Sequence, residues 1–166
     1  LVLTENRYPS EFVRAFKSME TQSNPWGFGS NTRADWAKDL DVKIWDKYNP
    51  TEYLYFVGCN GAFDNRGKKI ATAVVSSLKS AGVDFSILGN DEGCTGDPAR
   101  RAGNEYLFDI LASRNAKLFK EKSVMKIVTH CPHCFNSLKN EYSEFGVELD
   151  VIHHSELLEH LLKEGK

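Results

Sequence analysis

Four cysteines are the residues of this 166-residue sequence whose type and spacing point most directly to chemistry. Cys59 is followed after 34 residues by Cys94-Thr95, and after 35 more by the motif Cys131-Pro132-His133-Cys134. Thiolates bind zinc and iron-sulfur clusters, and four of them complete the ligand shell of either. The motif precedes a predicted helix, whose free N–H groups favour the thiolate form. We therefore predict one metal centre bound by Cys59, Cys94, Cys131 and Cys134.

Alternating apolar and amphipathic segments from residue 51 onward must position these thiols. Apolar runs typical of buried strands cover 53–57, 83–88, 125–129 and 147–152, and helical spacing covers 67–81, 105–120, 135–145 and 155–162. The alternation predicts an α/β fold, with a parallel sheet of about four strands and helices on both faces. The cysteines follow the first three strands, and the carboxyl ends of parallel strands share one edge, so we expect the four thiols to converge there.

Residues 1–50 have a different pattern from the rest of the chain. A helix is predicted from Pro9 to about Met19, residues 22–33 are rich in turn formers, and residues 36–45 supply scattered apolar anchors. We interpret residues 1–50 as a helical or irregular N-terminal extension or linker that wraps around the core. Residues 51–166 form the predicted cysteine-rich α/β domain.

The cysteine spacing over residues 53–162 resembles the cysteine-rich CCG domain of heterodisulfide reductases and of glycolate oxidase iron-sulfur subunits. That pattern is one Cys, about 30 to 40 residues, Cys-Cys-Gly, about 35 residues, and Cys-x-x-Cys. Segments 57–59, 93–101 and 131–136 resemble the C-terminal part of larger iron-sulfur oxidoreductases, in which a ferredoxin-like domain, and sometimes a membrane cytochrome domain, precedes this one. The resemblance implies an electron-transfer domain between a flavoprotein or ferredoxin-type donor and a quinone or disulfide acceptor. It also implies that Leu1 is a cut point within a longer protein.

Thr95 departs from this family pattern, because it stands where the second Cys of Cys-Cys-Gly is expected. In heterodisulfide reductases the five-cysteine motif is associated with a non-cubane 4Fe-4S cluster that uses the extra thiolate. Four thiolates suit an ordinary cubane 4Fe-4S cluster, and some copies of the motif in the family hold zinc. We therefore expect a 4Fe-4S cluster, with zinc as the alternative. The missing thiolate counts against a disulfide-cleaving role, whereas a relay of single electrons does not need it.

Other uses of the cysteines stay open. A zinc-stabilised scaffold module without redox activity would use the same four thiolates. The Cys-Pro-His-Cys motif is similar to the active site of thioredoxin-fold disulfide oxidases, but that fold places a cis-proline loop after the motif. Here only 32 residues follow Cys134, and none is Pro. Four cysteines at strand ends are also an unusual pattern for plain core residues.

Several polar residues near the cysteines are secondary candidates. His130, His133 and His153-His154 are expected at the same edge, where hydrogen bonds to cluster sulfurs or helix capping are the favoured roles. Asp97-Pro98 is typical of an N-cap followed by a first-turn proline. Arg100-Arg101 could raise the potential of a cluster or meet an acidic partner. The secondary site residues are Thr95, His133, His154 and Arg100. No catalytic residue is predicted.

Composition limits the other functional classes. The net charge is −2 and the isoelectric point about 6.2, and the basic residues are scattered, so we expect no nucleic-acid partner. The sequence contains no apolar run of about 18 residues and no signal-peptide pattern. We expect a cytoplasmic chain, or one at the cytoplasmic face of the membrane within a larger protein. The expected partners are a redox protein, a flavoprotein or an upstream ferredoxin-like domain.

Overall fold

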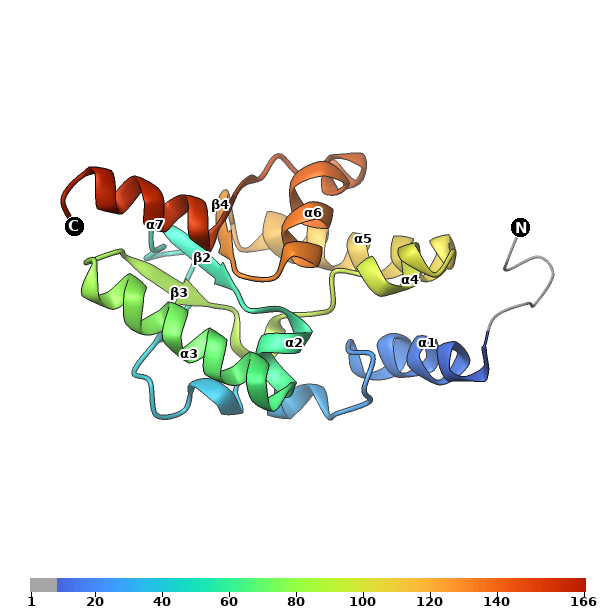
Figure 1. Ribbon diagram of the computed structural model, residues 1–166. Helices are drawn as coiled ribbons and strands as arrows, with labels where there is room; N and C mark the ends of the chain where they lie inside the picture. Colours follow the sequence, from blue (N-terminus) through green and yellow to red (C-terminus); the bar gives the residue numbers. More distant parts are fainter. Residues whose placement is uncertain (1–8) are drawn as a thin grey trace.

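The computed structural model describes residues 9–166, and the first eight residues of the predicted extension lie outside this range (Figure 1). The helices and strands, in chain order, are α1 (Ser10–Gln22), β1 (Lys43–Ile44), β2 (Tyr53–Phe56), α2 (Gly58–Phe63), α3 (Asn65–Ser80), β3 (Phe85–Ile87), α4 (Asp97–Arg101), α5 (Glu105–Glu121), β4 (Lys126–Thr129), α6 (Pro132–Asn140), β5 (Asp150–His153) and α7 (His154–Lys163). Short 3-10 turns are η1 (Ser30–Thr32), η2 (Asp35–Ala37), η3 (Gly89–Asp91) and η4 (Tyr142–Phe145).

Within residues 9–166, five strands form one parallel sheet in the order β1-β3-β2-β4-β5, which confirms the predicted α/β fold. The four predicted strands are present. The sequence does not predict β1, because this strand has two residues, both exposed, and no apolar run. From β2 the chain crosses to β3 on one side and then to β4 on the other. The direction therefore switches between β2 and β4, which is where open parallel sheets bind ligands.

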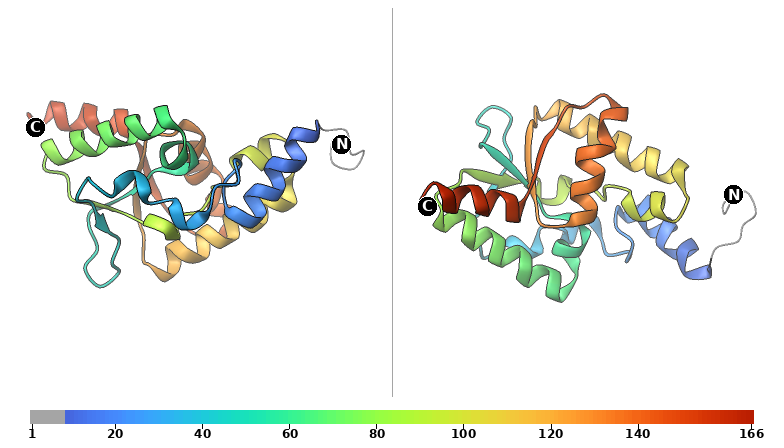
Figure 2. Two further views of the ribbon diagram at one scale, coloured as in Figure 1. Left: turned by 90° about the horizontal axis from the view of Figure 1, so that it is seen from below. Right: turned by 45° about the horizontal axis from the view of Figure 1, so that its top comes forward.

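Helices cover both faces of the sheet, as the alternation predicts (Figure 2). Side chains alternate along β2 and the residue after it, so Leu54 and Phe56 enter one core and Tyr55 and Val57 the other. Helices α5 and α6 close the first core, and α3 and α7 close the second. This two-sided burial explains why the strand reads as a continuous apolar run.

Some element boundaries differ from the predicted ones for local reasons. Helix α3 begins before residue 67, because the Asp64 carboxylate accepts hydrogen bonds from the N–H groups of Arg66 and Gly67 at 2.9 and 2.7 Å. The predicted helix 135–145 is divided into α6 and the turn η4. Helix α2 is not predicted at all. It follows β2 directly because Gly58 adopts a φ of +72°, which turns the chain sharply.

The N-terminal segment packs at the carboxyl edge of the sheet. Phe16 and Met19 of α1 share an apolar cluster with Cys59, Cys94 and residues of α4 and α5. In Figure 1, α1 lies beyond the end of β2 and runs beside α4. The segment therefore covers the edge at which the cysteines are expected. No helix of residues 9–166 combines the length and the apolar character that crossing a membrane requires.

Candidate metal centre

The four cysteines meet at one cavity of about 850 Å³. Cys59 lies in α2 directly after β2, and Cys94 lies in the loop between β3 and α4. Cys131 and Cys134 follow β4 at the start of α6. All four side chains line the cavity. The structure therefore brings together the thiols that the strand ends predict to converge.

The thiols form two pairs within this cavity. The thiols of Cys59 and Cys94 shift each other's pKa, and so do those of Cys131 and Cys134. None of the four takes part in a disulfide. Gly58 lies against the second pair, because a Cβ on it would be 2.9 Å from Cys134 Sγ. Within the described part of the chain, no group of three or more His, Cys, Asp or Glu side chains could hold a metal ion as it stands.

One thiol of each pair is acidified. The hydrogen bond from Cys94, supported by the charge of Arg33, lowers the pKa of Cys59 to about 7 against the effect of burial. The hydrogen bond from Cys134 and the backbone N–H groups of His133 and Cys134 lower the pKa of Cys131 to about 6. The donating thiols, Cys94 and Cys134, have pKa values raised by these hydrogen bonds and by burial. Each pair therefore offers one thiolate near neutral pH. For Cys131, at the start of α6, the sequence predicts this.

Gly58→Ala should lower the free energy of unfolding by roughly 2 to 4 kcal/mol, because it adds left-handed strain and a steric conflict with Cys134. Gly82→Ala is the matched control. Gly82 has a φ of +68° but open space around its Cβ position, so only the strain of about 1 to 2 kcal/mol applies. Urea unfolding of both variants measures the difference. Equal losses of unfolding free energy in the two variants would show that the contact with Cys134 does not contribute to the effect of Gly58→Ala.

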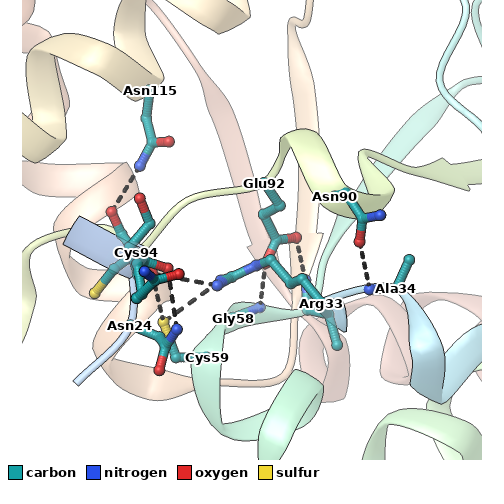
Figure 3. A network of polar contacts seen from close by, with 12 residues as sticks. Asn24, Arg33, Ala34, Gly58, Cys59, Asn90, Glu92, Cys94 and Asn115 are labelled. Atoms are coloured by element: carbon teal, nitrogen blue, oxygen red, sulfur yellow. Dashed lines mark hydrogen bonds and ion pairs between the residues drawn. The ribbon is translucent and has the colours of Figure 1, made fainter. Parts of the chain in front are cut away.

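The Cys94 loop is fixed from two sides. The N–H of Cys94 donates to the carbonyl of Ser23 at 3.0 Å, and its own carbonyl accepts from Asn115 Nδ2 at 2.8 Å. Figure 3 shows Asn115 above the loop. The Gly96 N–H points to Cys94 Sγ at 3.5 Å. The backbone at Cys94 is therefore held between the N-terminal segment and α5.

A buried ion pair lies beside Cys59 (Figure 3). Arg33 and Glu92 have side chains only 0% and 1% exposed, and Arg33 Nη2 is 3.0 Å from Glu92 Oε1. The same Nη2 donates to Cys59 Sγ at 3.4 Å. The Arg33 guanidinium thus bridges a carboxylate and a predicted ligand. Cys59 and Glu92 raise the pKa of Arg33 despite its burial, so it stays charged.

Glu92 also anchors the turn that carries Cys59. Its carboxylate accepts hydrogen bonds from the N–H groups of Val57 and Gly58, both at 2.9 Å. Burial raises the pKa of Glu92 above its ordinary value, although Arg33 and these backbone groups offset part of the effect. Four N–H groups, two of Arg33 and two of the backbone, donate hydrogen bonds to this carboxylate and offset the cost of its burial.

No pattern in the sequence indicates Arg33 or Glu92 as site residues. They are 59 positions apart and belong to no motif, and charged residues are exposed by default. The arginines that the sequence singles out lie elsewhere. Arg100 forms ion pairs with Glu105, Glu141 and Glu144 at 3.0, 3.5 and 3.6 Å and does not line the cavity. Its neighbour Arg101 lines the cavity but is paired with Asp97 and Glu141.

Thr95 and His133 both line the cavity. Thr95 is 2% exposed, and its place in the cavity lining puts the position of the missing thiolate at the site. His133 Nδ1 lies 3.0 Å from Asp97 Oδ2. The sequence predicts Asp97 as the N-cap of a helix, but it is the first residue of α4. The N-cap is Gly96. The Asp97 carboxylate binds side chains of α4 and α6 and so fixes the two helices to each other.

A histidine cluster forms another wall of the cavity. His130 and His154 line it, with ring centroids 6.4 Å apart. Burial lowers the pKa of His130 to about 4, with help from His154 and His153, so His130 is neutral. Burial also lowers the pKa of His154. His153 instead caps α7 together with Glu156, one of the roles expected for these histidines.

Comparison with known proteins relates the chain to iron-sulfur proteins. It is 45% identical, over its whole length, to 24% of the probable iron-sulfur-binding oxidoreductase FadF of Bacillus subtilis. It is 42% identical, again over its whole length, to 24% of the EtfAB:quinone oxidoreductase of Syntrophomonas wolfei. Over 86% of the chain, it is 34% identical to 35% of one subunit of the dihydromethanophenazine:CoB–CoM heterodisulfide reductase of Methanosarcina acetivorans.

The chain thus spans about a quarter of the length of the first two relatives. No solved structure matches it. Residues 53–139 match the family described as the cysteine-rich CCG domain. This match covers more than half of the chain and contains all four cysteines. The chain therefore belongs to the cysteine-rich CCG domain family, as the spacing of its cysteines predicts.

Proposed function

We propose that this chain is an iron-sulfur electron-transfer domain of a heterodisulfide reductase-like oxidoreductase. Cys59, Cys94, Cys131 and Cys134 hold one 4Fe-4S cluster in this proposal. Residues 51–166 are the cysteine-rich domain, and residues 1–50 are an extension packed on it. The observation that carries the proposal is the single cavity at the carboxyl edge of the sheet, lined by all four thiols.

The donor set fits a cluster. Zinc needs four sulfurs at about 2.3 Å from one ion, whereas a cubane takes one thiolate at each of four iron atoms. The four thiols line one cavity of about 850 Å³, which has room for a cluster, and no group of three or more His, Cys, Asp or Glu side chains of residues 9–166 is placed to hold a single ion. The cluster, when bound, supplies the ability to accept and release single electrons. The acidified thiols of Cys59 and Cys131 favour its ligation, and Arg33 holds a positive charge beside it.

The names of the relatives support the same class of function. They describe an iron-sulfur-binding oxidoreductase, a quinone oxidoreductase and a heterodisulfide reductase subunit. We therefore propose a flavoprotein or ferredoxin-type donor and a quinone or disulfide acceptor. The chain works within a longer protein at the cytoplasmic face of the membrane in this proposal.

Anaerobic reconstitution with iron and sulfide tests the proposal. The protein should take up about four iron and four sulfide per chain, turn brown and give an EPR signal of a 4Fe-4S cluster in one of its redox states. Metal analysis of protein isolated without air supplies the second measurement. A colourless protein that contains one zinc per chain and takes up no iron would replace the proposal with a zinc-stabilised scaffold.

A further inference from the structure

We propose that the cavity beside the cysteines binds a quinone-type ring, with a ring carbonyl accepting a hydrogen bond from His130 Nε2. The inference rests on the proposed function and deepens it, because it selects between the quinone and disulfide acceptors. It also places the binding site within this chain, next to the thiols. Three observations carry it: an unpartnered buried nitrogen, an apolar wall, and the size of the cavity.

His130 offers a donor that lacks an acceptor. The residue is 8% exposed, and its Nδ1 lies 2.7 Å from the hydroxyl of Tyr55, which is itself fully buried. The arrangement that satisfies both groups has the Tyr55 O–H donating to Nδ1, since the reverse would leave the hydroxyl proton without an acceptor. Nε2 then carries the ring proton. Among the described residues, Nε2 has no hydrogen-bond partner, although it is buried.

A buried N–H group without an acceptor is unfavourable, so the site is complete only when a ligand supplies one. Gly61 lies against this nitrogen, because a Cβ on it would be 3.2 Å from His130 Nε2. The imidazole and Cys131 line the same cavity, from which the ligand supplies this acceptor in our proposal. A carbonyl oxygen is a strong acceptor, whereas the sulfur atoms of a disulfide are weak ones.

The cavity also presents apolar side chains to solvent. Phe12, Trp26 and Ile70 line it and are 41%, 51% and 41% exposed. Large apolar side chains gathered at a cavity are typical of a binding site, and aromatic walls favour flat rings. Phe12 and Trp26 belong to the N-terminal segment, so this segment and the sheet domain each form part of the site.

The volume leaves room for both a cluster and a ring. A water molecule takes up about 30 Å³ in the liquid, and we use this volume for each of the eight atoms of a cluster core. The core then occupies roughly 240 Å³. The cavity measures about 850 Å³. The remaining space falls in the range of small-molecule sites, which runs from about 300 to 1,000 Å³.

Calorimetric titration of the anaerobically reconstituted, oxidised chain with 2,3-dimethyl-1,4-naphthoquinone tests the inference. Both carbon atoms of the quinone double bond carry methyl groups in this probe, which blocks addition of cysteine thiols. One molecule should bind per chain. His130→Phe should weaken binding about tenfold, because the donor is lost. His130→Gln retains an N–H donor and should bind within about threefold of the parent.

His160→Phe is the matched control, since His160 is an exposed histidine of α7 that does not line the cavity. It should bind like the parent. Trp26→Ala removes an aromatic wall of the cavity, should weaken binding at least about fivefold, and serves if His130→Phe does not fold. A loaded parent that does not bind the probe, or that binds it equally after His130→Phe, overturns this inference alone. Iron and sulfide are measured on the same samples, and a parent without a cluster overturns the proposed function as well.

Discussion

Arg33→Met should lower the free energy of unfolding of the metal-free chain by about 3 to 5 kcal/mol, because it leaves Glu92 buried without its counter-ion. The side chains of this pair are 0% and 1% exposed, so water cannot replace the lost guanidinium without a rearrangement. Methionine fills a similar volume, and the loss therefore reports on charge more than on packing. Urea unfolding followed by circular dichroism measures it.

Two further variants separate the causes of this loss. Lys43→Met removes a cation from the exposed pair Lys43–Asp84 and should cost less than about 1 kcal/mol. The double variant Arg33→Met with Glu92→Gln should be more stable than Arg33→Met alone, because it removes the unpaired charge while the amide oxygen can still accept from one of the two backbone N–H groups. A double variant that is no more stable would refute the electrostatic explanation.

Cys59→Ser should abolish cluster assembly, with iron uptake below about one tenth of the parent value, because a serine hydroxyl rarely replaces a thiolate on iron. Cys59 is the most informative of the proposed ligands to change. It lies far along the chain from Cys131 and Cys134, yet it shares their cavity. Iron analysis and the absorption spectrum after anaerobic reconstitution measure the effect.

Thr95→Ser is the control for Cys59→Ser, because it changes a cavity residue that supplies no thiolate. It should load iron like the parent. A thiol-disulfide oxidoreductase would behave differently: Cys59→Ser would be harmless, and Cys131→Ser would remove insulin reduction. Full iron uptake by Cys59→Ser would therefore contradict the four-ligand assignment.

The fold could be predicted because burial on both faces gives the strands a continuous apolar signal. Segments 53–57 and 125–129 carry this signal clearly, and both contain strands. Convergence of the cysteines followed from topology alone, since each of the first three predicted strands is followed by a thiol. Strand β1 and helix α2 could not be predicted in this way. They have two and six residues, too few for a periodic pattern, and depend on pairing with β3 and on the turn at Gly58.

The surroundings of the thiols were less predictable than the thiols themselves. The sequence draws attention to Arg100 and Arg101 because they follow Cys94 closely, but the carboxylates of α5, η4 and the residue after α6 hold Arg100 outside the cavity. The arginine that reaches a thiol, Arg33, comes from the loop before β1. Its role depends on tertiary packing between distant segments, for which a single sequence contains no local pattern.

The carbonyl of Ser23 links the N-terminal segment to the loop that carries Cys94. It accepts from the Cys94 N–H at 3.0 Å and from Arg33 Nη1 at 3.3 Å. An excised fragment limited to residues 53–139 would lose both Ser23 and Arg33, and with them the acceptor for the Cys94 loop and the counter-ion of Glu92. We therefore expect the smallest stable unit to be longer than residues 53–139, the region that matches the family model. Truncation experiments should keep residues 23–33 if the isolated domain is to assemble the proposed cluster.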